Sequence, residues 1–186
     1  MAVGVKSQIE PSVLVLAGEA VDFARFFESH VARARRLAWR LVGGDEAAAD
    51  DVVQEAFAKA YRGLAGFRAE ARLETWLHRI VVNEAASHHR RQRLWRLLIG
   101  GAPPEPTTPG DLQGDPGLRR IISGAVGRLS RGQREAFVLV HLEGYTVREA
   151  AALCDKSEGS VKRHLHRALQ RLREDLAPLR EGERDA

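Results

Sequence analysis

Apolar residues recur three and four positions apart through most of this chain, as they do along the buried side of an amphipathic α-helix. The spacing predicts a first helix from Asp22 to Val42. Two glycines then interrupt the pattern, and Asp45 is a residue type that caps the start of the next helix. Residues 1–20 lack this periodicity, so the pattern predicts a poorly ordered tail there.

Two helical patterns in residues 50–93 flank a loop rich in glycine and arginine at 63–72. Their apolar stripes consist of Val53, Ala56, Phe57, Ala60 and Leu64, and of Leu77, Ile80, Val81 and Ala85. The polar side of the first helix carries Asp51, Glu55 and Arg62, and that of the second carries Trp76, Arg79, Asn83 and Arg90. An aromatic ring, guanidinium groups and an amide on one exposed stripe suit unpaired bases and their phosphates. A tryptophan at a helix start is also often a core residue, and both interpretations of Trp76 are open at this point.

A second set of helical patterns starts at Leu118 and ends in a helix-turn-helix. Thr146 and Glu149 have the spacing of a capping box, which opens a short helix. After a turn, a long helix is predicted from Glu158 to about Leu176. The outer arc of this long helix carries Lys162, Arg163, His166, Arg167 and Gln170. A basic arc on the second helix of such a unit predicts binding in the major groove of DNA.

The stretch between the two sets, residues 97–117, contains five of the seven prolines, three acidic residues and no Lys or Arg. This composition predicts an irregular linker. In an extended form its length of about 21 residues would reach roughly 65 Å. Two helical turns of DNA span about 70 Å, so the linker would let two DNA-binding modules occupy well-separated sites.

Composition and charge narrow the class of function. With 44% hydrophobic and 29% charged residues over 186 positions, the chain is typical of a globular protein. Basic residues outnumber acidic ones in 23–96 and in 118–186, which favours polyanion binding at two places. A single cysteine, Cys154, argues against a disulfide framework or a CxxC metal site and fits a reducing cytosol. No apolar stretch is long enough to predict a membrane span, so we expect a cytoplasmic protein without direct membrane insertion.

The stretch 50–93 resembles the corresponding part, region 2, of the extracytoplasmic-function group of bacterial sigma factors. In that family the first helix typically reads D-x-x-Q-E-x-F, which is matched by Asp51, Gln54, Glu55 and Phe57. The second helix typically opens T-W-L and carries R-I-x-x-N, which is matched by Thr75, Trp76, Leu77, Arg79, Ile80 and Asn83. The resemblance implies binding to core RNA polymerase and recognition and melting of the promoter minus-ten element.

The same resemblance implies roles for individual residues. The polar face of the first helix would dock on the clamp helices of the largest polymerase subunit through Asp51, Gln54, Glu55 and Arg62. The minus-ten DNA would be bound by Arg68, Trp76, Arg79, Asn83 and Arg90. Arg68 belongs to this set because it follows Phe67 in the loop that, in the family, helps to capture a flipped base.

The second set of helices resembles region 4 of the same sigma factors. The family motifs are matched in order by Leu129-Ser130, Gly144-Tyr145-Thr146, Glu149-Ala150-Ala151 and Gly159-Ser160-Val161-Lys162. The resemblance implies that Lys162, Arg163, His166 and Arg167 contact the minus-thirty-five element. It also implies contact with the flap of the second-largest polymerase subunit, and an anti-sigma protein as a regulatory partner.

Together, the patterns and the resemblance predict an all-α sigma factor of two small helical domains joined by a Pro/Gly-rich linker, with the helix-turn-helix in the second domain. The expected divisions are an N-terminal tail over 1–21, a region 2 domain over 22–96, the linker over 97–117, a region 4 domain over 118–180 and a C-terminal tail over 181–186. We expect no catalysis, cofactor or metal.

Two alternatives compete with the sigma-factor interpretation. A free-standing helix-turn-helix regulator would account for residues 118–178 but not for the motifs of 51–83. A metal-dependent nuclease could use the carboxylates of 45–55, but no histidine joins them at a ligand spacing.

Overall fold

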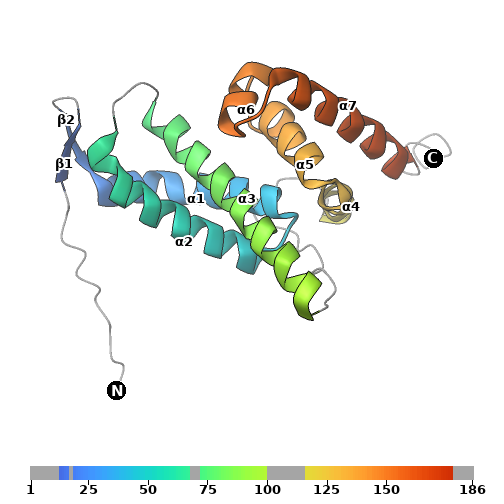
Figure 1. Ribbon diagram of the computed structural model, residues 1–186, viewed down its shortest axis with the longest axis horizontal. Helices are drawn as coiled ribbons and strands as arrows, with labels where there is room; N and C mark the ends of the chain where they lie inside the picture. The colour runs from blue at the N-terminus through green and yellow to red at the C-terminus, as the bar shows by residue number, and fades with distance from the viewer. Residues whose placement is uncertain (1–12, 17–18, 68–71, 100–115, 178–186) are drawn as a thin grey trace.

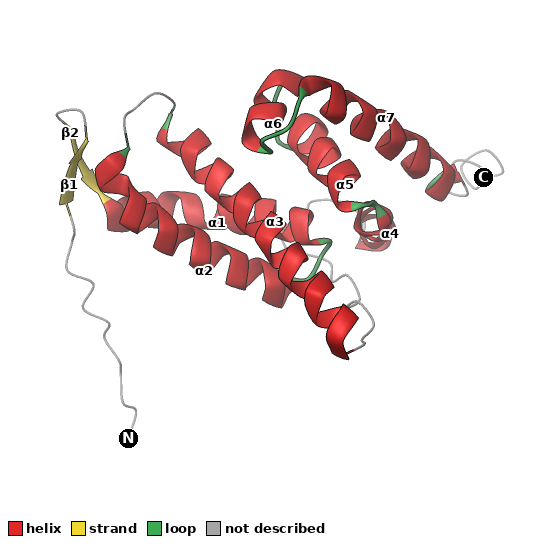
Figure 2. Ribbon diagram, viewed as in Figure 1, coloured by secondary structure: helices red, strands yellow, loops and turns green. Residues whose placement is uncertain are grey.

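The computed structural model describes residues 13–16, 19–67, 72–99 and 116–177, and its helices form two groups (Figure 1). The first group comprises α1 (Phe23–Val42), α2 (Glu46–Gly63) and α3 (Leu73–Ile99). The second comprises α4 (Pro116–Arg128), α5 (Arg131–Phe137), the π-helical turn η2 (Val138–Leu142), α6 (Val147–Leu153) and α7 (Glu158–Asp175). The predicted all-α fold, with a helix-turn-helix in the second part, is confirmed (Figure 2).

Short polar side chains fix the starts of the first helices. The Asp22 carboxylate accepts a hydrogen bond from the Ala24 N–H at 3.0 Å, and the Asp45 carboxylate accepts one from the Ala48 N–H at 3.0 Å. Gly43 ends α1 in the left-handed conformation with φ 86°, which glycine adopts at little cost because it lacks a Cβ atom. The predicted cap at Asp45 and the glycine break before it are therefore both confirmed.

Small and aliphatic residues let the three helices of the first group approach closely. The fully buried members of this core include Ala34, Leu37, Ala49, Ala56, Ala60 and Leu77. Short side chains at a crossing favour small distances between helix axes, which otherwise fall within about 8–10 Å. A larger side chain at one of these alanines would force the helices apart, at a cost of typically 1–3 kcal/mol.

Glu84 lies on the buried side of α3, where its carboxylate needs a partner. Its side chain is 5% exposed, and Nζ of Lys59 on α2 lies 2.7 Å from its Oε1. A buried charge without such a partner would carry a desolvation cost of several kcal/mol. The pair therefore ties α2 to α3, which explains why an acidic residue falls next to an apolar stripe.

The second group packs around α5 and α7. Gly132 of α5 lies directly against the ring of His164 on α7, since a Cβ atom at this glycine would come within 2.8 Å of the ring. The predicted capping box opens α6: the Glu149 N–H donates to the Thr146 hydroxyl at 3.2 Å, and the Thr146 N–H donates to the Glu149 carboxylate at 2.8 Å. The turn before α7 passes through Asp155 at φ 53°. α6, this turn and α7 form the predicted helix-turn-helix.

The described part of the segment before α1 differs from the poorly ordered tail predicted for residues 1–20, of which 1–12 lie outside the described residues. β1 (Val13–Leu16) and β2 (Glu19–Asp22) pair as antiparallel strands, with Leu16 opposite Glu19. This register needs a connection of only two residues, which is the commonest hairpin loop length. Two strands of four residues leave no signal in a helical periodicity. The strand pair leads directly into α1 (Figure 2).

The ends of the predicted linker, 97–117, are helical. α3 continues to Ile99 and α4 already begins at Pro116. Leucine at positions 97 and 98 is a good helix former, and proline is favoured at the first position of a helix because its missing N–H would have no partner there. Residues 100–115 lie outside the described residues.

Candidate nucleic-acid interface

Three of the residues predicted to bind the minus-ten element lie on one stripe of α3. Arg79, Asn83 and Arg90 are all exposed, and Nη2 of Arg90 donates to the Ser87 hydroxyl at 2.7 Å. An exposed amide can both donate and accept hydrogen bonds at a base edge, and guanidinium groups bind phosphates and stack on bases. The stripe therefore presents the chemical groups that the sequence pattern predicted.

Trp76 combines the two interpretations that its sequence position left open. Its ring is half-buried and packs against the ring of Phe67, with the centroids 5.2 Å apart. Gly63 leaves space for it, because a Cβ atom at that glycine would lie 3.2 Å from Cζ2 of the indole. The protein thus holds the ring in a fixed orientation while part of it reaches the surface. Arg68, predicted to act beside it, lies outside the described residues.

The polar face of α2 presents the residues predicted to bind polymerase. Asp51, Gln54 and Arg62 are exposed, and Glu55 is half-buried. Nη2 of Arg62 lies 3.5 Å from Oε1 of Glu55, so these two form a surface ion pair. The opposite, apolar face of α2 is buried in the core of the first group. The polar face is therefore accessible to another protein.

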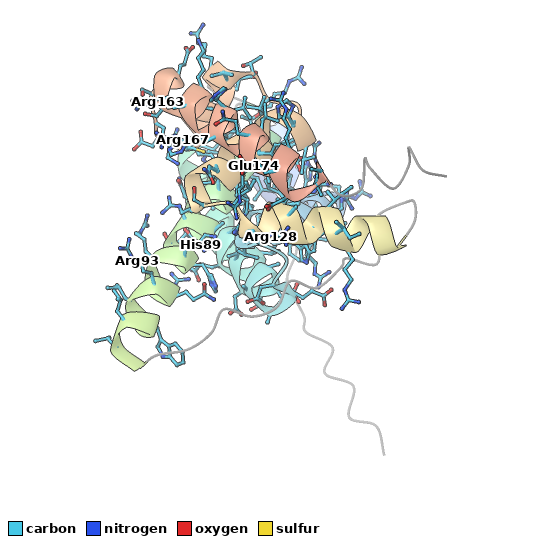
Figure 3. The ribbon with its side chains drawn as sticks, turned by 90° about the vertical axis from the view of Figure 1, so that its right-hand side faces the viewer. His89, Arg93, Arg128, Arg163, Arg167 and Glu174 are labelled. Atoms are coloured by element: carbon cyan, nitrogen blue, oxygen red, sulfur yellow. The ribbon has the colours of Figure 1, made fainter. Side chains whose placement is uncertain are left out.

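The outer arc of α7 is basic and faces solvent. The residues predicted to bind the minus-thirty-five element are all exposed: Lys162, Arg163, His166 and Arg167. Figure 3 shows Arg163 and Arg167 projecting from α7. At the start of the helix, the Ser157 hydroxyl accepts a hydrogen bond from the Ser160 N–H at 3.2 Å. This cap holds the first turn of α7, from which the basic arc begins.

The stripe on α3, in contrast, borders a cleft between the two groups of helices. The cleft has a volume of about 350 Å³, with Asn83 and Arg90 on one wall and Arg131 and Lys156 on the other. Glu135 lies between those two cations: Nε of Arg131 is 2.6 Å from its Oε1, and Lys156 pairs with its other oxygen. Within this structure, the predicted minus-ten stripe therefore faces the second group.

A buried arginine crosses from the second group to the first. Arg134 of α5 is 7% exposed, and its guanidinium donates to the carbonyl oxygens of Val126, Gly127 and Leu129 around the end of α4. Its Nη1 also donates to the carbonyl of Leu41, near the end of α1, at 3.1 Å. Carbonyls at a helix C-terminus lack partners within the helix and carry partial negative charge, so they suit a cation. Burial lowers the pKa of Arg134, although an arginine stays charged near neutral pH.

Side-chain pairs accompany this contact, among them Nε of Arg33 at 3.9 Å from Oε2 of Glu143. Nη1 of Arg40 lies 2.6 Å from Oε1 of Glu143, whose side chain is 6% exposed. Nδ1 of His78 lies 2.5 Å from the Tyr145 hydroxyl. Burial lowers the pKa of His78 to about 4, because the charged imidazolium would lose its hydration, so the ring is neutral near pH 7.

The sequence patterns did not identify the residues of this junction. Arg134, Glu143 and Tyr145 were not singled out as contacts between the two parts of the chain. Most residues of α5, RGQREAF, are polar or charged, so nothing in the local pattern marks Arg134 as buried. The acceptors of Arg134 are main-chain carbonyls. Because every residue has one, the sequence does not indicate which carbonyls bind the guanidinium.

The carboxylates of residues 45–55 form a helix cap and ion pairs. Asp45 caps α2, Asp50 pairs with Arg35 at 2.5 Å, and Oε1 of Glu55 lies 3.8 Å from Nζ of Lys59. Among the residues that the structure describes, no three His, Cys, Asp or Glu side chains form a group that could hold a metal ion. The nuclease alternative thus gains no support from these carboxylates. In the same part of the chain, no helix is long and apolar enough to cross a membrane.

Two family models match the chain, one for each group of helices. The model of Sigma-70 region 2 matches residues 26–94, and that of Sigma-70, region 4, matches residues 119–172. The ECF RNA polymerase sigma factor SigM of Mycobacterium tuberculosis is 34% identical over 178 residues, which cover 95% of this chain and 88% of that protein. The ECF RNA polymerase sigma-E factor of Escherichia coli is 34% identical over 141 residues, covering 69% of this chain and 74% of that protein.

Solved structures with similar folds include two protein complexes. The sigma factor RpoE in complex with the anti-sigma factor NepR from Bartonella quintana has a TM-score of 0.71 and 28% identity, and the match covers 84% of this chain and 97% of that one. CnrH in complex with the cytosolic domain of CnrY has a TM-score of 0.59 and 28% identity, with coverage of 84% and 88%. The arrangement of helices thus matches that of solved proteins over most of the chain.

Proposed function

This chain belongs to the ECF RNA polymerase sigma factors, and we propose that its two groups of helices divide the family's work between them. The group α1–α3 binds core polymerase and captures the melted minus-ten element, and the group α4–α7 reads the minus-thirty-five element. The observation that carries this division is that each group presents its own exposed basic stripe, on α3 and on α7.

The polar face of α2 is the proposed polymerase anchor. Its exposed Asp51, Gln54 and Arg62 lie on one side of a helix whose other side is buried, so they can meet the clamp helices of the largest subunit without unfolding the bundle. The second group would contact the flap of the second-largest subunit. In this way the two contacts would hold the two DNA-reading helices at a fixed separation on the enzyme.

The stripe on α3 is the proposed site for the unpaired minus-ten strand. Trp76 supplies a ring surface, Asn83 an amide for a base edge, and Arg79 and Arg90 charges for phosphates. Stacking on an aromatic side chain is worth about 1–3 kcal/mol per base, so capture of unstacked bases favours strand opening without catalysis by the protein itself. We therefore propose a non-enzymatic role, which needs no cofactor and operates where the polymerase works, in the cytoplasm.

An anti-sigma protein is the proposed regulatory partner. Two solved structures that resemble this chain, at 28% identity each, are complexes: one with the anti-sigma factor NepR, the other with the cytosolic domain of CnrY. Both matches cover 84% of this chain, with TM-scores of 0.71 and 0.59, which supports a similar arrangement of helices for such a partner to bind. A partner that covers α2 or α3 would compete directly with polymerase or DNA.

The decisive experiment is run-off transcription with purified protein and core polymerase, followed by sequencing of the transcripts. A sigma factor directs initiation at a small set of promoters that share elements near minus ten and minus thirty-five. A free-standing helix-turn-helix regulator would bind DNA but leave core polymerase inactive at those promoters. The absence of specific initiation would therefore reject the proposed function.

The anchor on α2 has its own test. Asp51→Arg with Gln54→Ala should abolish co-elution with core polymerase while helical content stays intact, because both positions are exposed. Glu28→Arg, an equally exposed reversal on α1, is the matched control and should co-elute like the parent. Normal co-elution of the double variant would show that polymerase binds another surface.

A further inference from the structure

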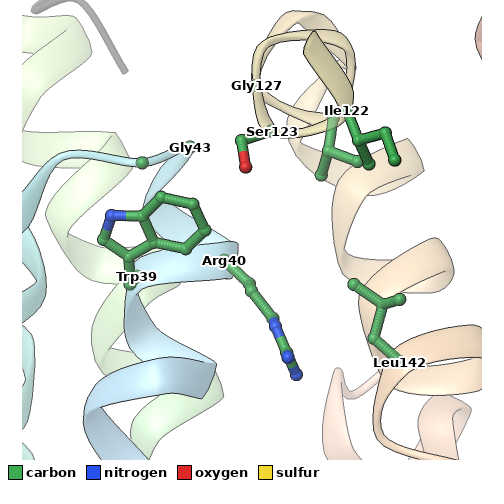
Figure 4. A pocket seen from close by; sticks show the side chains of 9 residues that line it. Trp39, Arg40, Gly43, Ile122, Ser123, Gly127 and Leu142 are labelled. Atoms are coloured by element: carbon green, nitrogen blue, oxygen red, sulfur yellow. The ribbon is translucent and has the colours of Figure 1, made fainter. Parts of the chain in front are cut away.

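The junction between the two groups of helices is small, polar and well defined. It contains the Arg134 bond to the Leu41 carbonyl, the Arg40–Glu143 ion pair and the His78–Tyr145 hydrogen bond. An apolar pocket of about 140 Å³ lies beside these contacts, between Trp39 and Arg40 of α1 and residues of α4 and η2 that include Ile122 and Leu142 (Figure 4). The groups therefore meet through specific polar pairs next to an incompletely filled apolar surface.

We propose that this junction is an intramolecular latch, which holds the second group over the α3 stripe and must open before unpaired DNA can reach Asn83. The proposal rests on the proposed function for the role of that stripe. Asn83 and Arg90 border a cleft of about 350 Å³ whose far wall belongs to the second group. Such a volume is at the lower end of pockets that hold one small molecule, so a strand of several nucleotides does not fit against Asn83 and Arg90 in the closed arrangement.

The main contact is organised before the groups meet. Three of the four carbonyls bound by Arg134 belong to the second group, so its guanidinium is already oriented when that group is folded. One bond, to the Leu41 carbonyl, crosses to the first group. The same carbonyl accepts from Nε2 of His89 on α3 at 3.0 Å. When the two groups meet, the Leu41 carbonyl oxygen therefore accepts a second hydrogen bond, and His89 already holds this oxygen in place.

The shape of the first group accommodates the latch at Gly43. A Cβ atom at this position would lie 2.7 Å from Nη1 of Arg134, closer than real Cβ atoms come to another side chain. The left-handed turn at Gly43 thus ends α1 and also leaves the space into which the guanidinium fits. This fit supports a specific closed arrangement over loose association of two linked domains.

The remaining pairs can be released without damage to either group. Glu143 and Arg40 both become hydrated when the groups separate, so each charge exchanges its partner for water. Tyr145 stays anchored in its own group by its main-chain N–H, which donates to the Leu139 carbonyl at 2.9 Å. Its hydroxyl, which bonds His78, is the part that crosses the junction. Tyr145→Phe with Glu143→Gln therefore weakens the latch while both helical cores are preserved.

The test measures the distance between the two groups in the full chain. Cysteines placed at the exposed positions Glu28 and Glu174, in a Cys154→Ala background, carry spin labels for pulsed electron–electron distance measurement. The labelled parent should show one narrow distance distribution, and the latch variant should gain a second population at other distances that is at least several-fold larger than in the parent. Asp50→Asn is the matched control, because it removes an exposed ion pair with Arg35 inside the first group and should change nothing.

Binding of single-stranded DNA connects the latch to the stripe. The probe is the non-template minus-ten strand of a promoter found by run-off sequencing, and the latch variant should bind it several-fold more tightly than the parent in the absence of polymerase. Unchanged distances in the latch variant, a broad distribution already in the parent, or opening without tighter binding would each overturn the proposal. Failure of run-off initiation would instead count against the proposed function, since the distance measurement does not depend on polymerase.

Discussion

The two stripes that we propose to bind DNA differ in their accessibility. The arc on α7 is exposed and its helix is capped within its own group. The stripe on α3 carries comparable chemistry, but it borders a cleft closed by the other group. The comparison teaches that exposure of each residue is not sufficient for a binding surface, because a strand of nucleic acid needs an uninterrupted path along it.

The difference follows the chemistry of the two targets. A recognition helix enters the major groove of intact duplex, so its arc can be accessible at all times. Unpaired bases exist only after polymerase has begun to open the promoter, and a stripe that binds any single strand would bind wrong partners before then. In the proposed closed form, the second group covers the single-strand site on α3 and leaves the duplex-binding arc on α7 accessible.

The largest effect on the α3 stripe should come from Trp76→Ala. Loss of stacking should reduce open-complex formation roughly ten-fold or more, at about 1–3 kcal/mol per base. The ring is half-buried against Phe67, so we also expect a stability loss of about 2 kcal/mol, below the range for a fully buried aromatic. Permanganate footprinting on duplex and pre-melted promoters checks this, with Trp76→Phe as the control that keeps a ring. Equal defects on both templates would contradict a role in melting.

On α7, Arg167→Ala should remove preference at one base pair of the upstream element. A bidentate arginine–guanine contact discriminates by about 1–3 kcal/mol, which is roughly ten-fold or more. Affinities over a library of single-base substitutions would show it, with the exposed Arg171→Ala as the control on the same helix. Because the α7 arc is not covered, the latch variant should give the same duplex affinities as the parent. A uniform loss at every site would assign base reading to another residue.

Acid should open the latch through His78. Four groups face this ring: Arg33 and His30 lower its pKa, Glu74 raises it, and the Tyr145 hydroxyl is bonded to it. Burial, the dominant cause, lowers its pKa to about 4 from the ordinary value of 6.5, so the closed form is fully stable above pH 6.5 and loses stability as the pH falls towards 4. If opening restores the ordinary pKa, the ratio of closed to open protein should fall about ten-fold between pH 7.5 and 5.5.

The labelled chain measures this acid effect directly, and His78→Gln is the variant that should flatten it. A neutral amide cannot gain a proton in this range, so the distance distribution should then stay constant from pH 7.5 to 5.5. An unaltered pH response in His78→Gln would assign the effect to another group. The pKa values of His88 and His89, which burial also lowers, make these two histidines the next candidates.

The smallest expected effect on DNA binding is that of Lys162→Ala. Its ammonium lies at the start of the exposed arc, where we expect contact with phosphate. Lys162→Ala should weaken binding to all sites alike and reduce the slope of log affinity against log salt by about one. Titrations at several salt concentrations test this, and selective loss at one base would show that Lys162 reads sequence.

The helices themselves could be predicted because their signals are local. Asp45, Gly43 and the Thr146–Glu149 capping box act within a few residues, so their spacing predicted the ends of α1 and the starts of α2 and α6. The exposed arc of α7 likewise follows from helical periodicity. The extension of α3 to Ile99 was missed, since composition predicted a linker from residue 97 onwards.

Features that depend on distant partners could not be predicted. The buried Glu84 pairs with Lys59, which lies 25 residues earlier in the chain, so no local pattern indicates the pair. Asn83 lies on the predicted stripe, yet nothing in the neighbouring sequence indicates that the second group faces it. Such contacts depend on how two folded parts meet, and their acceptors include main-chain oxygens that have no sequence signature.

The Leu41 carbonyl gives the junction an unusual tolerance to sequence change. No substitution at position 41 removes a main-chain oxygen. Sequence changes in the first group therefore leave the acceptor for Arg134 in place, provided that α1 still ends at a glycine. A chimaera that joins the first group of this chain to a second group from another sigma factor should therefore still close, if the donor carries an arginine at the position of Arg134. Domain exchange would then create new promoter preferences without loss of the closed state.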